Sequence, residues 1–484
     1  MKVSMEHVWK WLACALLVCL MAIGVSTIMH DASYELSDDT IVQMHIGIGK
    51  AFPLNEAHVY SPGKGRFFPL GYQHFNSLLL LSPSGVSANM VYAFESILWS
   101  LFILVVFLLS KASLPQNVNG AWRWLIPLCL TVIIGQRTLQ FFTVLWTCST
   151  WAFLLLALAI LVWYYYCRDR KYCQLVLFTL LLLYYTYTQE SNVVVPFMIG
   201  LCAVLHINQS EKRDMPLIYS MIGIVALFVG LYMALIFPHI DSAYDPAHGE
   251  NVGFVENAIR ILFNQKLLIL TIAIFGWRIY KVFVKKEVFD SYADTLLATS
   301  IAIMSANLVL KLNYPIYYTS AILLSVPAYM SVLDFSNKTR KILSIGAVVL
   351  VTIYFAPKYY KLISSIRTQR TAVYKEMNSF DSACQNAKTI VWYMDGAESR
   401  GVEDEWAKTH VNDHLKYLQH EPFVEYSKET VDGLSEYLLV TPISHHQEEV
   451  LSQCGIQEQN IEYIAIAPSI QYYLIKIQQN ECNQ

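Results

Sequence analysis

Residues 9–40 read WKWLACALLVCLMAIGVSTIMHDASYELSDDT, an apolar run that ends in a short acidic segment. The apolar part, residues 9–29, is long enough to span a membrane, which takes about 20 mostly apolar residues. Lys2 and Lys10 flank its N-terminal end, and the positive-inside rule places that end in the cytoplasm. A cleaved signal peptide is the alternative interpretation, but no A-x-A site follows the run. We therefore predict a retained membrane helix with the acids on its outer side.

Basic and acidic connecting segments alternate along the rest of the chain as they do on the two sides of the first span. Basic residues cluster in every second connecting segment, as in Arg168-Asp169-Arg170-Lys171, whereas the alternate segments carry acids such as Glu190. An odd number of spans leaves the polar C-terminal region outside. We predict a polytopic α-helical membrane protein with about eleven spans. The ten after the first lie near residues 88–110, 121–137, 141–166, 172–188, 193–207, 216–238, 261–280, 292–311, 315–333 and 342–357.

The composition agrees with a membrane protein and argues against several functional classes. Of the 484 residues only 15% are charged, against about 25% in a soluble domain. A net charge of −3 gives no case for nucleic acid binding. The sequence has no P-loop, no G-x-S-x-G and no H-E-x-x-H motif, so ATP-driven transport and serine or zinc hydrolysis lose support. It also has no Cys/His metal spacing, and we predict no metal cofactor.

The composition changes at about residue 358. Residues 1–357 hold the long apolar runs and an outer loop, residues 30–87, in which we expect two helices along the membrane surface. Residues 358–484 are polar, with short apolar stretches typical of strands near 387–394, 436–440 and 461–477. We predict a transmembrane domain, residues 1–357, followed by a small extracytoplasmic α/β domain, residues 358–484.

Three acids near predicted outer helix ends are candidates for chemistry. Asp38 and Asp39 are adjacent and follow the first span, where they could hold a general base or bind a metal. Acids at a helix N-terminus also stabilise that helix by about 0.3–1 kcal/mol without any other role. Glu190 lies with Gln189 in a polar break of an apolar stretch. An ionisable group there is costly and therefore a functional candidate, with a water-exposed turn as the alternative.

Three cations run against the positive-inside tendency. Arg137 and Arg66 lie in predicted outer segments, and Lys311 lies near the outer end of a span. A guanidinium binds a phosphate group through two parallel hydrogen bonds. We therefore predict an anionic ligand at the outer leaflet, while contact with lipid phosphates is the alternative for each cation alone.

The order of these features resembles the GT-C superfamily, the integral-membrane glycosyltransferases that use polyprenyl-phosphate-linked sugars. The resemblance covers residues 1–357 and rests on a first helix, the Asp38-Asp39 motif in a long outer loop, many short-looped spans and a final soluble region. Residues 311–318, KLNYPIYY, also resemble the K-x-x-Y-P-R-Y pattern of the protein mannosyltransferase and aminoarabinose transferase branch. Here Ile316 replaces the usual arginine.

The resemblance implies transfer of a sugar, with inversion, from a polyprenyl-phosphate donor to an acceptor hydroxyl on the outer face. An aspartate would act as base and cations would stabilise the leaving phosphate. The acceptor would be a glycan, lipid or protein, and the setting a bacterial inner membrane. The implied roles are catalysis for Asp38, Asp39 and Glu190, donor phosphate binding for Arg137, Lys311 and Arg66, and acceptor contact or support for Tyr314, Gln189 and His74.

Other functional classes stay open. An O-antigen polymerase-like or ligase-like enzyme shares the lipid-linked donor, but relies on arginine-rich outer loops late in the chain. A flippase or other transporter of lipid-linked glycans would favour inverted repeats and ionisable groups near mid-membrane. In this sequence no repeat is evident, and we expect the ionisable groups at helix ends. A structural membrane protein with a partner-binding tail is the last alternative.

Overall fold

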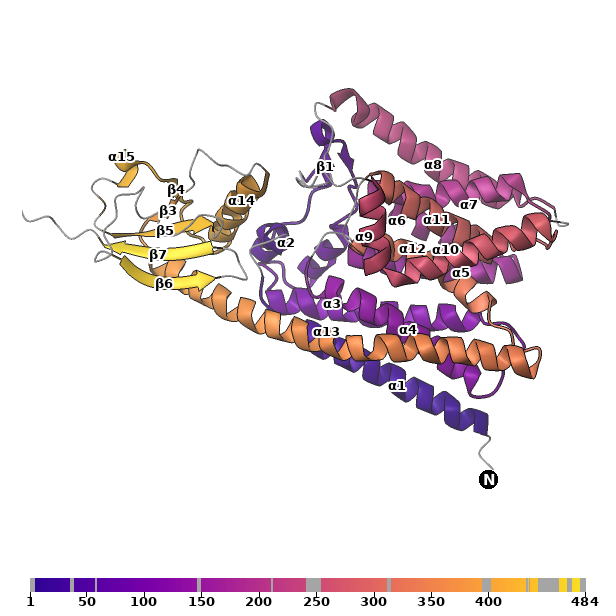
Figure 1. Cartoon of the computed structure of the whole chain (residues 1–484). Helices are drawn as coiled ribbons and strands as arrows, with labels where there is room; N and C mark the ends of the chain where they lie inside the picture. The colour runs from indigo at the N-terminus through magenta and orange to yellow at the C-terminus, as the bar shows by residue number, and fades with distance from the viewer. Residues whose placement is uncertain are drawn as a thin grey trace, which may run out of the picture.

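The computed structural model shows a bundle of helices, from which one long helix runs to a small region built around a sheet (Figure 1). Asp38, Lys311 and Tyr314 lie outside the residues that the structure describes. Those residues are 5–34, 39–56, 59–145, 149–209, 212–240, 254–310, 315–393, 402–431, 434, 436–442, 461–467 and 472–478.

A helix is found in each of the eleven predicted apolar runs. Seven helices of the described part are long and apolar enough to cross a membrane, and α6, α7 and α11 are shorter apolar helices. The protein is therefore an integral membrane protein, and the count of eleven spans stays a prediction. The helices are α1 (Met5–Ile28), α3 (Ala88–Ala112), α4 (Trp122–Thr138), α5 (Ser149–Asp169), α6 (Tyr172–Thr186), α7 (Val194–Leu205), α8 (Met215–Leu235), α10 (Lys266–Ile279), α11 (Ala293–Val309), α12 (Thr319–Ser331) and α13 (Lys338–Asn386).

One predicted run is divided between two helices. The run 261–280 begins within α9 (Phe254–Asn264) and continues in α10 after a break at Gln265. Gln265 has φ −114° and ψ 65°, outside the helical region, and it lies between two other polar residues. An apolar average over the whole run therefore hides the point at which the helix stops.

Close packing joins α1 to α3. Gly24 of α1 faces Trp99 of α3, and a Cβ atom at position 24 would lie only 2.0 Å from the indole ring. Small residues let membrane helices approach closely, and here the gap is filled by a fully buried tryptophan. The contact fixes how the first outer loop leaves the bundle.

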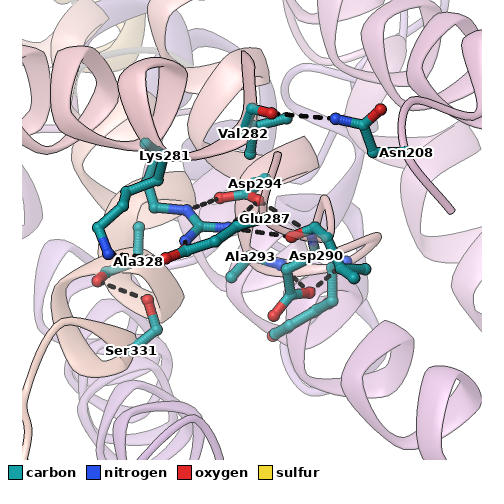
Figure 2. Close-up of polar contacts among 12 residues, drawn as sticks. Asn208, Lys281, Val282, Glu287, Asp290, Ala293, Asp294, Ala328 and Ser331 are labelled. Atoms are coloured by element: carbon teal, nitrogen blue, oxygen red, sulfur yellow. Dashed lines mark hydrogen bonds and ion pairs between the residues drawn. The ribbon is translucent and has the colours of Figure 1, made fainter. Parts of the chain in front are cut away.

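Charged residues gather at the end of the bundle away from the sheet. There Arg170 pairs with Asp214 at 2.7 Å, and Lys281 pairs with Glu287 at 2.6 Å. Figure 2 shows the second pair beside Asp294, which accepts hydrogen bonds from Arg278, together with the bond from Asn208 to the carbonyl of Val282. Segments that the charge rule assigns to the cytoplasm thus lie together, and their orientation in a membrane stays a prediction.

The first outer loop contains two helices, as the sequence predicts: α2 (Asp39–His45) and the 3₁₀ helix η3 (Gln73–Leu80). Between them lie η1 (Ile46–Ile48), β1 (Tyr60–Ser61), η2 (Pro62–Lys64) and β2 (Arg66–Phe67). The first five residues of α2 are buried, which differs from the expected position along the membrane surface. The reason is that α14 (Val402–Tyr417) packs onto α2 and covers it (Figure 1).

The C-terminal region holds a five-stranded sheet of order β4-β3-β5-β7-β6. Strand β3 pairs in parallel with β4 and β5, whereas β7 is antiparallel to β5 and β6. The described part of the chain thus contains the predicted small α/β region, but α13 passes residue 358 as one helix, so the domain boundary stays a prediction. The elements are β3 (Ile390–Trp392), β4 (Val424–Glu425), α15 (Lys428–Val431), β5 (Glu436–Pro442), β6 (Ile461–Ala467) and β7 (Tyr472–Gln478).

Candidate active site

Asp39 is the first residue of α2 and is fully buried. The hydroxyl of Tyr92, in α3, donates to its Oδ2 atom at 2.8 Å, and the backbone N–H of Leu145 donates to Oδ1 at 3.0 Å. Each carboxylate oxygen is therefore held by a donor from a different part of the chain. Hydrogen bonds to a charged carboxylate are short and strong, so the orientation of Asp39 is fixed.

A buried arginine lies on the other side of Tyr92. Arg370 of α13 is 4% exposed, and the carbon at the centre of its guanidinium lies 4.2 Å from the centre of the Tyr92 ring. Its Nε atom donates to the carbonyl of His30 at 2.7 Å, and Nη1 donates to the carbonyl of Thr143 at 2.5 Å. Acid, phenol and cation thus form one connected group between α2, α3 and α13.

Two histidines of α14 form hydrogen bonds with buried residues of α2. Nδ1 of His410 forms a 2.6 Å hydrogen bond with the hydroxyl of Thr40, the residue after Asp39. His414 bridges Gln43 of α2, at 2.9 Å, and Asp381 of α13, at 2.7 Å. The C-terminal region is therefore joined by hydrogen bonds to the helix that carries Asp39.

His74, predicted as an acceptor-contacting or supporting residue, lies close to this group. It is buried in η3, and its ring stacks on Trp151 with 9° between the planes and 5.7 Å between centres. Burial lowers the pKa of His74 to about 3, so the ring is neutral at physiological pH. Its Nε2 atom is 4.0 Å from Oε1 of Glu95, an acid that we did not single out from the sequence.

Glu95 departs from the expectation that ionisable groups lie only at helix ends. It is in the second turn of α3, inside the predicted span 88–110, and is 1% exposed. An acid within an apolar run is itself a functional signal, and applying that rule to this run would have found it. Asp39 is near enough to act on Glu95 electrostatically.

A second group of predicted residues meets at the turn before α7. Glu190 begins the short 3₁₀ helix η5 (Glu190–Val193), and its Oε1 atom accepts a 2.9 Å hydrogen bond from the backbone N–H of Phe67. Phe67 follows Arg66 in β2, so Arg66 and Glu190 lie near each other and interact electrostatically. Gln189 directly precedes η5. The structure thus brings three of the predicted site residues together.

Arg137 contacts an aromatic ring of α13. It ends α4, and its guanidinium carbon is 5.1 Å from the centre of the Phe355 ring of α13. A cation over an aromatic face is attracted by the ring quadrupole. A role in binding the donor phosphate stays a prediction for Arg137, as it does for Lys311 and Arg66.

The described ranges contain no group of three or more His, Cys, Asp or Glu side chains arranged to hold a metal ion. Asp38, the neighbour of Asp39, lies outside those ranges. Independence from metals therefore stays a prediction.

The sequence matches no family model and no curated protein. Among solved structures the chain is similar to ArnT from Cupriavidus metallidurans in the apo state. The two are 11% identical with a TM-score of 0.51, over 96% of this chain and 98% of ArnT. This alignment establishes a shared fold.

Two structures from Archaeoglobus fulgidus align less closely. An oligosaccharyltransferase in complex with zinc and sulfate is 11% identical with a TM-score of 0.48, over 92% of this chain and 71% of that one. The oligosaccharyltransferase AglB with an inhibitory peptide and a dolichol-phosphate is 11% identical with a TM-score of 0.46, over 90% and 70%. ArnT is an aminoarabinose transferase of the GT-C type. The chain therefore has the membrane fold of the GT-C glycosyltransferases, as the order of its sequence features predicts.

Proposed function

We propose that this protein is a glycosyltransferase that moves a sugar, with inversion, from a polyprenyl-phosphate-linked donor to an acceptor hydroxyl. The acceptor is a glycan, a lipid or a protein. The observation that carries the proposal is the placement of Asp39. Its carboxylate is buried and oriented by Tyr92 and Leu145 in a fold shared with ArnT.

The proposed reaction needs a base and a site for the leaving group. One aspartate of the Asp38-Asp39 pair takes the proton of the acceptor hydroxyl, and the oxygen attacks the anomeric carbon. The bond from that carbon to the phosphate oxygen breaks on the opposite face, and the electron pair leaves with the lipid phosphate. Preorganised cations stabilise the charge that develops on that oxygen. Arg66, Arg137 and Lys311 are the candidates for this role.

Glu190 has a supporting role in this proposal. Its carboxylate accepts a hydrogen bond from the backbone of β2 and faces Arg66, so it holds the loop that carries this cation. A change at Glu190 would therefore displace Arg66 relative to the donor.

The proposed setting is a bacterial inner membrane. The N-terminus and the charged clusters of Arg170 and Lys281 face the cytoplasm, and the sheet region lies outside. Residues 1–357 form the catalytic membrane domain and residues 358–484 the soluble domain.

The position of Glu95 argues against a transporter, which would favour ionisable groups near the middle of the membrane. Glu95 is only about 10 Å from the start of α3, short of the middle of a layer about 30 Å thick.

The test uses purified protein and a panel of polyprenyl-phosphate-linked sugars, with release of free polyprenyl phosphate as the readout. We expect wild-type protein to release it from at least one donor in the presence of an acceptor mixture from bacterial membranes. Asp38→Asn, Asp39→Asn and Glu190→Gln are compared with Asp169→Asn, an acid at the opposite end of the bundle. Loss of polyprenyl phosphate release in one of the two aspartate variants supports the proposal. Full release in both aspartate variants would show that neither aspartate is the catalytic base.

A further inference from the structure

Glu95 and His74 are buried polar residues without a well-formed hydrogen bond in the described part of the chain. Both carboxylate oxygens of Glu95 and both ring nitrogens of His74 lack a hydrogen bond of normal geometry within the described residues. The nearest candidates are the hydroxyl of Thr150 for Glu95 and the backbone of Gly71 for His74. They are 1% and 7% exposed. Buried polar groups in native proteins are nearly always satisfied, and an exception points to a ligand or a function.

The distance between the two side chains suits one bridging oxygen atom. Oε1 of Glu95 and Nε2 of His74 are 4.0 Å apart, too far for a direct hydrogen bond. A single oxygen placed to one side of the line that joins them can reach both atoms at normal hydrogen-bond distances of about 2.8 Å. A hydroxyl group has one donor and two acceptor positions, so it can donate to the carboxylate and accept from the imidazole N–H.

Aromatic side chains form the wall behind this pair. The indole of Trp151 is nearly parallel to the His74 ring, and the rings of Phe75 and Phe94 lie 4.1 Å and 6.2 Å from it, centre to centre. The indole N–H of Trp151 is also buried without a partner among the described residues. An apolar wall with a few convergent polar atoms is the usual composition of a small-molecule site.

The pair lies next to the acid of the proposed reaction. Tyr92, whose hydroxyl donates to Asp39, is three residues before Glu95 in α3, so both project from the same face of that helix. The charge of Asp39 acts on Glu95, which agrees with this proximity.

We propose that Glu95 and His74, backed by Trp151, bind a hydroxyl group of a sugar beside Asp39. This inference rests on the proposed function and adds the residues that recognise the sugar. The bound hydroxyl lies to one side of these two atoms, which are 4.0 Å apart, and satisfies one atom on each side chain. Because both residues are buried, the proposal requires η3 to open for the sugar and to return to the described position once the sugar is bound.

The first test compares stability with activity in purified protein. Glu95→Leu removes an unsatisfied polar group, so we expect a higher melting temperature together with at least a tenfold loss of polyprenyl phosphate release. Ser96→Ala is the control, because its hydroxyl already donates to the carbonyl of Tyr92, and it should not raise the melting temperature. Normal release in the Glu95→Leu protein would overturn the inference.

A second variant covers the case in which leucine does not fit. Glu95→Gln keeps the size of the side chain, so we expect a normal melting temperature with at least a tenfold lower kcat/KM for the sugar substrate. His74→Gln should act in the same direction. Unchanged kcat/KM in the Glu95→Gln protein would equally contradict the inference.

Deoxy sugars show whether the bound hydroxyl belongs to the donor or to the acceptor. If it belongs to the donor, wild-type protein should lose rate with one deoxy donor, while Glu95→Gln treats that donor and its parent alike. If it belongs to the acceptor, the same result appears with one deoxy acceptor. If each deoxy sugar lowers the rate of the Glu95→Gln protein as much as it lowers the rate of wild type, for donors and acceptors alike, Glu95 does not contact a hydroxyl of either sugar. Wild-type protein that releases polyprenyl phosphate from no donor contradicts the proposed function itself, a different result from these.

Discussion

The Nδ1 atom of His410 in α14 lies 2.6 Å from the hydroxyl oxygen of Thr40 in α2. These residues are 370 positions apart, and Thr40 directly follows Asp39. One turn further along α14, His414 makes the matching contact to Gln43. The helix that carries Asp39 is therefore held between the membrane bundle and the C-terminal region.

Replacing His414 by alanine should weaken this attachment. Gln43 and Asp381 would each lose a hydrogen-bond partner. Gln43 is buried, and an unsatisfied buried polar group costs about 1–3 kcal/mol, whereas Asp381 is partly exposed. We expect a lower melting temperature and slower turnover, with normal membrane levels. Lys416→Ala is the control on the same helix, because its exposed pair with Asp413 is worth about 0–1 kcal/mol. Equal effects of the two changes would show that His414 does not hold α2.

Replacing Arg370 by lysine should destabilise the protein although the charge is kept. An ammonium cannot reach the carbonyls of His30 and Thr143 together, and it loses the planar contact with Tyr92. We expect a loss of about 1–3 kcal/mol in the free energy of unfolding, measured by denaturation in detergent. Arg367→Lys, in the same helix but bonded to the exposed Ser26, should change stability much less.

A methyl group at position 24 should disturb the contact between α1 and α3. The new Cβ atom would meet the buried ring of Trp99 at 2.0 Å, and overpacking of this kind costs about 1–3 kcal/mol. Gly24→Ala should therefore lower the melting temperature, whereas Gly223→Ala in α8 has open space around it and should not. A Gly24→Ala protein as stable as wild type would mean that the two helices are farther apart.

The buried ring of His74 should make stability depend on pH. Its pKa is lowered to about 3 in the folded protein, against about 6.5 when unfolded. Between these values the unfolded chain binds the additional proton, so stability falls as the pH drops below about 6.5. The slope is at most about 1.4 kcal/mol per pH unit. Chemical denaturation from pH 7 to pH 5 should give a shallower slope for His74→Leu than for wild type, and parallel curves would contradict the assignment.

The sequence predicts the bundle well because each apolar run is a local property. Positions of the spans, the strands near 390 and 438, and the two helices of the first loop follow from patterns within about 20 residues. The break at Gln265 was missed because an average over the run conceals a single polar turn.

The site was predicted less completely because its contacts join distant segments. Arg370 belongs by composition to the polar tail, yet its hydrogen bonds reach residues 227 and 340 positions away. Nothing local indicates that it faces Tyr92. The nearness of Arg66 to Glu190 likewise depends on how β2 returns to the bundle. Glu95 is the exception, since an acid in an apolar run was visible in the sequence.

The 49 residues of α13 have a mechanical consequence. Sixteen of them follow Arg370 and form an arm about 24 Å long that ends just before β3. Helix α14 lies between the sheet region and α2, so the sheet region is connected to the bundle twice, through the arm and through α14 (Figure 1). A tilt of the arm by about 5° would move its far end by about 2 Å. A movement of the sheet relative to the bundle is therefore transmitted through α14 to Asp39, unless the contact between α14 and α2 breaks first.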